Sequence, residues 1–135
     1  ADPDAVWAKL HRRRTPIGAV LMDQSVLAGV GNVFRAESLF AHGMSPLRPA
    51  NTLTREEFDA LWLTVNLMLR AGARTGRIVT TKPEHRARRS GAARADDAHY
   101  VYRRTDLPCR ICGTPVRTAS LATRNSYWCP TCQPS

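Results

Sequence analysis

Four cysteines near the C-terminus form two Cys-x2-Cys pairs, separated by sixteen residues: Cys109, Cys112, Cys129 and Cys132. Each pair makes a tight turn that aims two thiolates at one point, and two such turns complete the tetrahedron that zinc prefers. The intervening residues are enough for a β-hairpin, with strands expected at 115–118 and 126–128. Because four thiolates leave no position open for water, we expect one structural zinc ion.

Two other interpretations of the cysteines are weaker. A disulfide framework belongs to secreted proteins, and the first ten residues lack the basic and apolar regions of a secretory signal. A thioredoxin-like redox site needs a Cys-x2-Cys that opens a helix in a βαβ unit, which the short tail lacks. We therefore expect a reducing, cytoplasmic compartment, with zinc supplying most of the folding free energy of residues 100–135.

Helix-start patterns dominate the first 76 residues. Asp2 precedes Pro3 and predicts a helix over about 3–12, and Thr15 before Pro16 predicts a second one that ends between 23 and 27. Asn32 is an expected N-cap for a helix over 33–42. These helices should carry one apolar face each, as in a small bundle.

A longer helix is predicted after residue 54. Thr54 and Glu57 form a capping box, and apolar residues then recur at offsets of three and four: Phe58, Leu61, Trp62, Val65, Met68 and Leu69. This face is expected to close the bundle. The fold class that follows is mainly α, a helical bundle and then a small hairpin zinc unit, with a separate core for each.

Charge points to a polyanionic partner. Twenty Lys and Arg, eighteen of them Arg, oppose eleven Asp and Glu and leave a net charge of +9. Residues 74–104 carry +6 of that charge and have no apolar periodicity, apart from a brief strand expected at 78–81. We therefore divide the chain into 1–76, a basic flexible loop at 77–99, and 100–135. The loop is either a solvated linker or a direct DNA contact.

No run in the sequence approaches the roughly 18 apolar residues that a membrane span requires, so we expect no membrane role.

The chain also offers a second candidate site, a glycine-rich turn that leads into the helix predicted at 33–42. Gly29 and Gly31 permit close approach of a ligand, and the backbone N–H groups at Asn32 favour an anion such as phosphate. The alternative is a glycine-rich turn with an N-cap and no ligand. A dinucleotide site is excluded, because no strand precedes the turn and the third glycine is missing.

The hairpin of the zinc unit presents a further candidate, Arg124. It lies beside the expected turn, where its guanidinium can reach a phosphate. The alternative is a solvent-facing charge with no ligand.

Two stretches, LMDQSVLAGVGNVFRAESLF (21–40) and VYRRTDLPCRICGTPVRTASLATRNSYWCPTCQ (101–133), closely resemble the formamidopyrimidine-DNA glycosylase and endonuclease VIII family. The resemblance covers only the family's C-terminal half, the helix-two-turn-helix domain and the zinc finger. It implies that Asn32 and Arg124 hold the DNA backbone around an everted damaged nucleotide. Within the family, the formamidopyrimidine-DNA glycosylases usually have Lys where this chain has Gly18. The glycine favours the endonuclease VIII-like branch and removes one phosphate contact that the other branch would have.

The resemblance also implies what this chain lacks. Family catalysis uses an N-terminal Pro amine and an adjacent Glu, whereas Pro3 is internal, so we assign no catalytic residue. We expect the DNA-binding half of a bifunctional DNA glycosylase and abasic-site lyase of base excision repair for oxidised bases. Its partner is double-stranded DNA, damaged or abasic, bound by a monomer. The alternatives are a stand-alone DNA-binding protein built from the same two modules, and an RNA- or protein-binding zinc ribbon.

Overall fold

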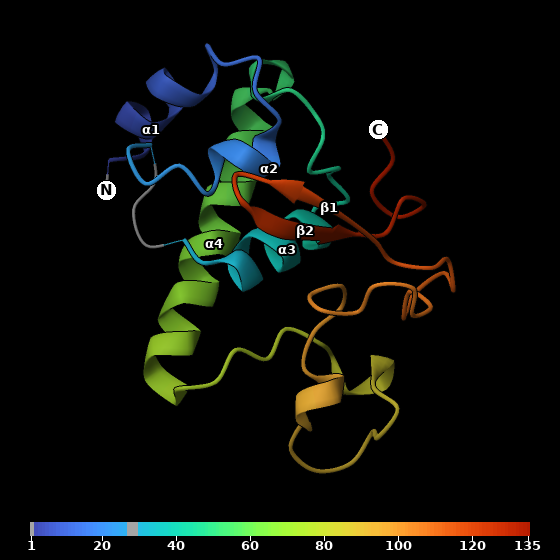
Figure 1. The fold of residues 1–135 in the computed structure, drawn as a ribbon. Coiled ribbons are helices and arrows are strands. Elements are labelled where there is room, and N and C mark those ends of the chain that lie inside the picture. Colours follow the sequence, from blue (N-terminus) through green and yellow to red (C-terminus); the bar gives the residue numbers. More distant parts are fainter. Residues whose placement is uncertain (1, 27–29) are drawn as a thin grey trace.

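Four α-helices, three short 3-10 helices and one β-hairpin make up the regular structure of residues 2–26 and 30–135, the part described by this computed structural model (Figure 1). In chain order the elements are α1 (Pro3–Leu10), α2 (Ile17–Val20), α3 (Asn32–Ala41), η1 (Ala50–Thr52), α4 (Arg55–Thr75), η2 (Pro83–His85), η3 (Ala95–Asp97), β1 (Arg117–Leu121) and β2 (Arg124–Trp128), where η marks a 3-10 helix. The predicted class, mainly α with a small hairpin, is confirmed. None of the helices in those ranges is long and apolar enough to cross a bilayer.

The capping residues act at two helix starts as predicted. Asp2 accepts a hydrogen bond from the Asp4 backbone N–H at 3.0 Å and caps α1. At α4 the box is complete, because Thr54 Oγ1 accepts from the Glu57 N–H at 3.1 Å and Glu57 Oε1 accepts from the Thr54 N–H at 2.9 Å. Each of these bonds joins residues two or three apart, so local sequence is enough to specify it.

The second helix differs from its prediction. It covers Ile17–Val20 only, and its N-cap is Pro16 without a side-chain bond, so the predicted cap at Thr15 is wrong. The loop after α3 takes over that role, since Ile17 N–H donates to Arg48 O at 2.7 Å and Gly18 N–H donates to Pro46 O at 2.9 Å. A Cβ on Gly18 would lie 2.8 Å from Pro46 Cβ, so this approach requires glycine.

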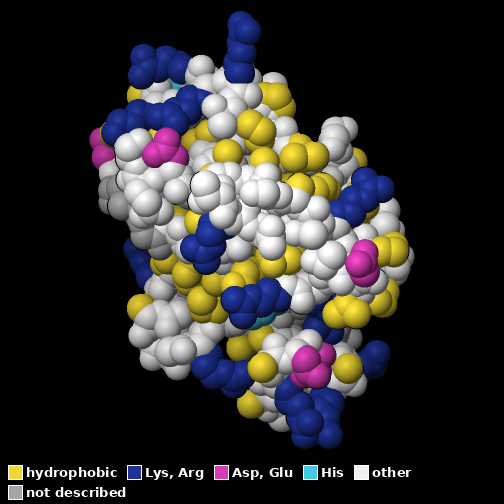
Figure 2. All heavy atoms as spheres, in the orientation of Figure 1, with side chains coloured by type: hydrophobic (Ala, Val, Ile, Leu, Met, Phe, Trp, Pro, Cys, Tyr) yellow, Lys and Arg dark blue, Asp and Glu magenta, His cyan; other side chains and the backbone are white. Residues whose placement is uncertain are grey.

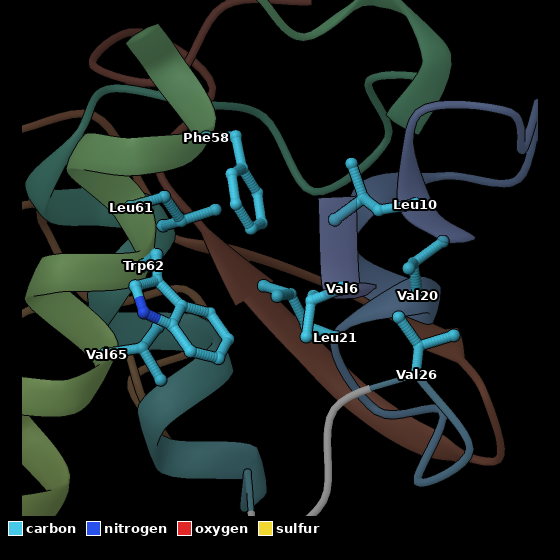
Figure 3. Close-up of a pocket in the computed structure, with 9 residues that line it drawn as sticks. All are labelled: Val6, Leu10, Val20, Leu21, Val26, Phe58, Leu61, Trp62 and Val65. Atoms are coloured by element: carbon cyan, nitrogen blue, oxygen red, sulfur yellow. The ribbon is translucent and has the colours of Figure 1, made fainter. Parts of the chain in front are cut away.

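The first hydrophobic core lies between α4 and the N-terminal helices. Figure 3 shows the side chains that meet there: Val6, Leu10, Val20, Leu21, Val26, Phe58, Leu61, Trp62 and Val65. The predicted apolar face of α4 supplies four of them. The space left between these side chains is about 10 Å³, close to the minimum for one water molecule. This region is therefore packed core and has no room for a ligand.

A second core joins α3 to the cysteine-rich unit, so the expectation that this unit has a core of its own is wrong. Ala36 and Phe40 of α3 pack with residues of that unit: Val101, Cys109, Val116, Cys129, Tyr102, Tyr127 and Cys132. In Figure 1 the hairpin lies along α3. The buried Gln133 adds a polar link, accepting from Cys129 N–H and donating to Met44 O, both at 2.9 Å. The reason is that α3 buries two faces, one toward each core.

The segment between α4 and the cysteine-rich unit contains η2 and η3, and the strand predicted at 78–81 is absent from this described stretch. Its amides find other partners, since Thr80 N–H donates to Ala98 O at 2.9 Å. Glu37 of α3, 1% exposed, accepts from the backbone N–H groups of Tyr100, Val101 and Tyr102 at 2.7, 2.9 and 3.1 Å. This buried carboxylate thus attaches the start of the cysteine-rich unit to α3, and the hydroxyl of Thr80 in the preceding segment also donates to it.

Candidate nucleic-acid interface

The four predicted metal ligands meet at one point. The Sγ atoms of Cys109, Cys112, Cys129 and Cys132 all lie within 4.8 Å of one another. Cys109 and Cys132 are 3.9 Å apart and Cys112 and Cys129 are 3.4 Å apart, with no disulfide. Zinc–sulfur bonds of about 2.3 Å in a tetrahedron place the sulfurs about 3.8 Å apart. The cluster therefore fits one zinc ion, with no ligand position left for water.

The turns around these cysteines have the geometry of zinc knuckles. Gly113 has φ +79° and its N–H donates to Cys109 O at 2.9 Å, which tightens the first turn. In the second turn Cys132 N–H donates to Cys129 Sγ at 3.4 Å. A hydrogen bond with Thr114 lowers the pKa of Cys112 to about 6, whereas burial raises the pKa of Cys129 and Cys132. The metal must therefore displace protons from these two thiols, and its affinity should fall in acid.

Asn32, at the start of α3, has a different role from the predicted N-cap. The N-cap is Gly31, and Asn32 is the first helical residue with no side-chain cap bond, so the predicted Asn32 N-cap is wrong. Its Nδ2 instead donates to Asn125 O of β2 at 2.8 Å. The side chain reaches the hairpin because β2 lies against α3. The prediction for Gly29 falls outside the described residues.

Gly31 has no conformational need to be glycine within the described chain. Its φ is −88°, and a Cβ there would meet only Phe34 Cδ2, at an ordinary 3.7 Å. The space beside Gly31 is consistent with close approach of a ligand to the N-terminus of α3.

Arg35 joins these elements, and sequence reasoning missed it. It is fully buried, and its guanidinium donates to oxygen acceptors from all three nitrogens. Nε and Nη2 donate to Asn32 Oδ1 at 3.0 and 2.7 Å. Nη1 donates to Gly18 O at 3.0 Å and to Leu121 O at 2.8 Å. Nη2 also donates to Arg124 O at 3.2 Å. The one signal for Arg35 in the sequence is its place one turn after Asn32 in a chain with many arginines.

All of these acceptors are amide oxygens, so the charge of Arg35 is stabilised without a carboxylate among them. Burial, and secondarily the charge of Arg124, lowers the pKa of Arg35 to about 10. At neutral pH the guanidinium stays protonated. It therefore adds positive potential beneath the N-terminus of α3 and beside Arg124.

The hairpin turn held by Arg35 is strained. Its two central residues, Ala122 and Thr123, have φ of +55° and +65°, values that a β-branched side chain rarely adopts. Arg35 binds the carbonyl on either side of them, at Leu121 and Arg124. Strain of about 1 to 3 kcal/mol per residue persists where the surroundings fix it, and such sites are often functional.

Arg124, the second predicted contact, is exposed beside this turn and pairs with Leu121 in the hairpin register. Across residues 2–26 and 30–135, no group hydrogen-bonds its guanidinium. The structure thus brings the start of α3 and the hairpin end together, with Asn32 and Arg35 bonded to the strand that carries Arg124.

Comparison with known families supports this architecture. Residues 1–84 match the formamidopyrimidine-DNA glycosylase H2TH domain, and residues 106–134 match the zinc finger found in FPG and IleRS. Among curated proteins, Endonuclease 8 1 of Mycobacterium tuberculosis is 45% identical over 133 residues, which cover 98% of this chain and 50% of that protein. The chain spans about half the length of the curated relatives it matches.

Solved structures of related proteins match this chain over about half of their own length. The MutM (FPG) protein of Thermus thermophilus has a TM-score of 0.76 and 34% identity, covering 98% of this chain and 50% of that one. Lactococcus lactis Fpg in complex with DNA that contains an abasic site has a TM-score of 0.76 and 22% identity, covering 99% and 48%. At that lower identity the likeness concerns the fold.

Proposed function

Because the chain belongs to the formamidopyrimidine-DNA glycosylase and endonuclease VIII family, whose C-terminal half it matches, we propose that it is the DNA-binding half of a bifunctional base-excision-repair enzyme. The whole protein would remove oxidised bases and cut the strand at the abasic site. We assign no catalytic residue within 1–135. The ligand of this chain is then duplex DNA at a damaged or abasic nucleotide, bound by an intracellular monomer.

The proposed contact is with the DNA backbone. The first amides of α3 and the positive end of its dipole favour a phosphate, and Gly31 leaves the space for it. Arg124 adds a charged donor from the hairpin side. Residues 1–76 and 100–135 would thus grip one stretch of backbone from two sides, with 77–99 beside them.

The observation that carries this proposal is the bond between Asn32 Nδ2 and Asn125 O at 2.8 Å. It joins residues 93 positions apart, one at the anion-favouring helix end and one next to the exposed arginine. Zinc supports the arrangement indirectly, because the four cysteines hold the base of the hairpin.

The test compares Arg124→Ala with Arg117→Ala by fluorescence anisotropy on a duplex with a stable abasic-site analogue. Arg117 is a matched control, an exposed arginine on the paired strand. Arg124→Ala should cost about 1 to 3 kcal/mol of binding free energy and make the salt dependence shallower. Equal effects of the two substitutions would remove Arg124 from the site.

Asn32→Ala needs two readouts, because Asn32 also bonds Arg35 and the hairpin. Its urea-unfolding free energy should fall by about 1 kcal/mol, and the folded variant should also bind the duplex more weakly. A variant that loses stability and binds normally once folded would leave Asn32 with a structural role only.

A further inference from the structure

A second group of cations lies apart from this interface, in residues 82–94, which we call the arginine segment. Figure 2 shows dark-blue Lys and Arg side chains gathered at the lower end of the molecule, over the loop that joins η2 to η3. Within the described structure four of its cations are exposed with no hydrogen bond or ion pair at their charged groups: Lys82, Arg88, Arg89 and Arg94. The segment contains a single acid, Glu84.

A buried carboxylate fixes the middle of this segment. Asp97, 4% exposed, accepts from the Ala87 N–H at 3.1 Å and from the Arg88 N–H at 3.0 Å. These bonds hold the pKa of Asp97 below its ordinary value, so the group is ionised at neutral pH. The backbone that carries Arg88 and Arg89 is thus held at a defined place.

The zinc knuckle holds Asp97 in turn. Arg110, between Cys109 and Cys112, donates from Nη1 to Asp97 Oδ1 at 3.1 Å, and the side chains of this pair are only 8% and 6% exposed. Arg110 also donates to His99 O at 2.9 Å and to Asp96 O at 2.8 Å. A chain of contacts therefore runs from the metal-binding turn through Arg110 and Asp97 to the arginine segment.

We propose that the arginine segment is a second phosphate-contacting surface for the same DNA duplex, presented by Asp97 and Arg110. This rests on the proposed function, and it adds a contact outside the Asn32 and Arg124 interface. A segment so rich in charge and poor in apolar residues would otherwise be disordered. Fixing it before binding lowers the ordering cost of each phosphate contact.

Charge alone predicts the opposite role for Asp97. A carboxylate next to the arginines weakens the local positive potential, so removing it should tighten DNA binding. If Asp97 instead presents the arginines, removing its charge should weaken binding although the chain becomes more positive. The two explanations therefore differ in the sign of one measured effect.

The first experiment measures the salt dependence of binding to a duplex for Arg88→Ser/Arg89→Ser and for a control, Arg14→Ser/Arg70→Ser. All four arginines are exposed, and both variants lose two charges. Loss of two phosphate contacts should lower the slope of log affinity against log salt by about 1.8. Equal slopes for the two variants would overturn the proposal.

The second experiment uses Asp97→Asn, with folding checked by circular dichroism. We expect this variant to bind the duplex more weakly than the wild type does. Trypsin should also cleave it faster after Arg88 and Arg89. Bound DNA should protect these two sites in the wild type and should fail to protect them in the variant. Tighter binding, or unchanged cleavage, would overturn presentation by Asp97. If the wild-type chain itself fails to bind duplex at low salt, the proposed function fails with it, whereas wild-type binding with equal slopes rejects the arginine segment alone.

Discussion

Arg35→Met tests whether the buried guanidinium holds the interface together. The substitution keeps much of the apolar volume and removes every N–H donor of the side chain. Four oxygens lose a donor: Gly18 O, Leu121 O, Arg124 O and Asn32 Oδ1. At about 1 kcal/mol for each orphaned acceptor the loss is about 4 kcal/mol, and about 1 kcal/mol returns because a charge no longer has to be buried.

The expected result is a fall of about 3 kcal/mol in the free energy of unfolding, a large part of the stability of a chain this size. Urea unfolding followed by circular dichroism, with zinc present throughout, measures it. Because the strained turn at Ala122 and Thr123 loses both of its Arg35 bonds, the folded variant should also bind duplex DNA as weakly as Arg124→Ala.

Arg35→Lys is the matched variant, since it keeps the charge and loses the planar fork. It should lose nearly as much stability as Arg35→Met, because one ammonium group cannot reach acceptors on α2, α3 and the hairpin together. A loss below about 1 kcal/mol for Arg35→Met would refute the reasoning. Full rescue of DNA binding by Arg35→Lys would show that the charge matters and the geometry does not.

Three further outcomes follow from the contacts described above. Chelation of the metal should unfold residues 100–135 and also lower the melting temperature of the helices, because Ala36 and Phe40 of α3 lose the apolar side chains packed on them. Circular dichroism at 222 nm measures this melting temperature, and an unchanged value would contradict a core shared by α3 and the cysteine-rich unit. Thr123→Gly should raise stability by about 1 kcal/mol in urea unfolding, because glycine adopts positive φ without strain, and a loss would mean that the turn is relaxed. Arg48 holds the pKa of Glu57 at about 2, below the ordinary 4.5, so the contribution of Glu57 to stability is complete above pH 4.5 and is lost as pH falls toward 2. The free energy of unfolding of Glu57→Gln should therefore fall less than that of the wild type over this pH range. Parallel curves of unfolding free energy against pH would exclude the ion pair as the cause.

Features that depend on near neighbours in the chain were predictable. The Cys-x2-Cys pairs determined the metal site, Asp2 and the Thr54–Glu57 box fixed two helix starts, and the apolar spacing of α4 identified its buried face. In each case the partners lie within one or two turns of one another, or are bound by a shared metal. The family resemblance carried the fold class further than these local patterns do.

Tertiary contacts decided the rest. Thr15 and Asn32 have the residue types of N-caps, yet the amides of α2 are bonded by the loop at Pro46 and Arg48, and Asn32 turns to the hairpin. Arg35 reaches acceptors as many as 89 positions away, and its place one turn after Asn32 is too weak a signal to separate it from the exposed arginines. Asparagine, threonine and arginine side chains can each bond many partners of similar chemistry. Only the packing of α3 against both cores determines which of those partners lies within hydrogen-bond distance.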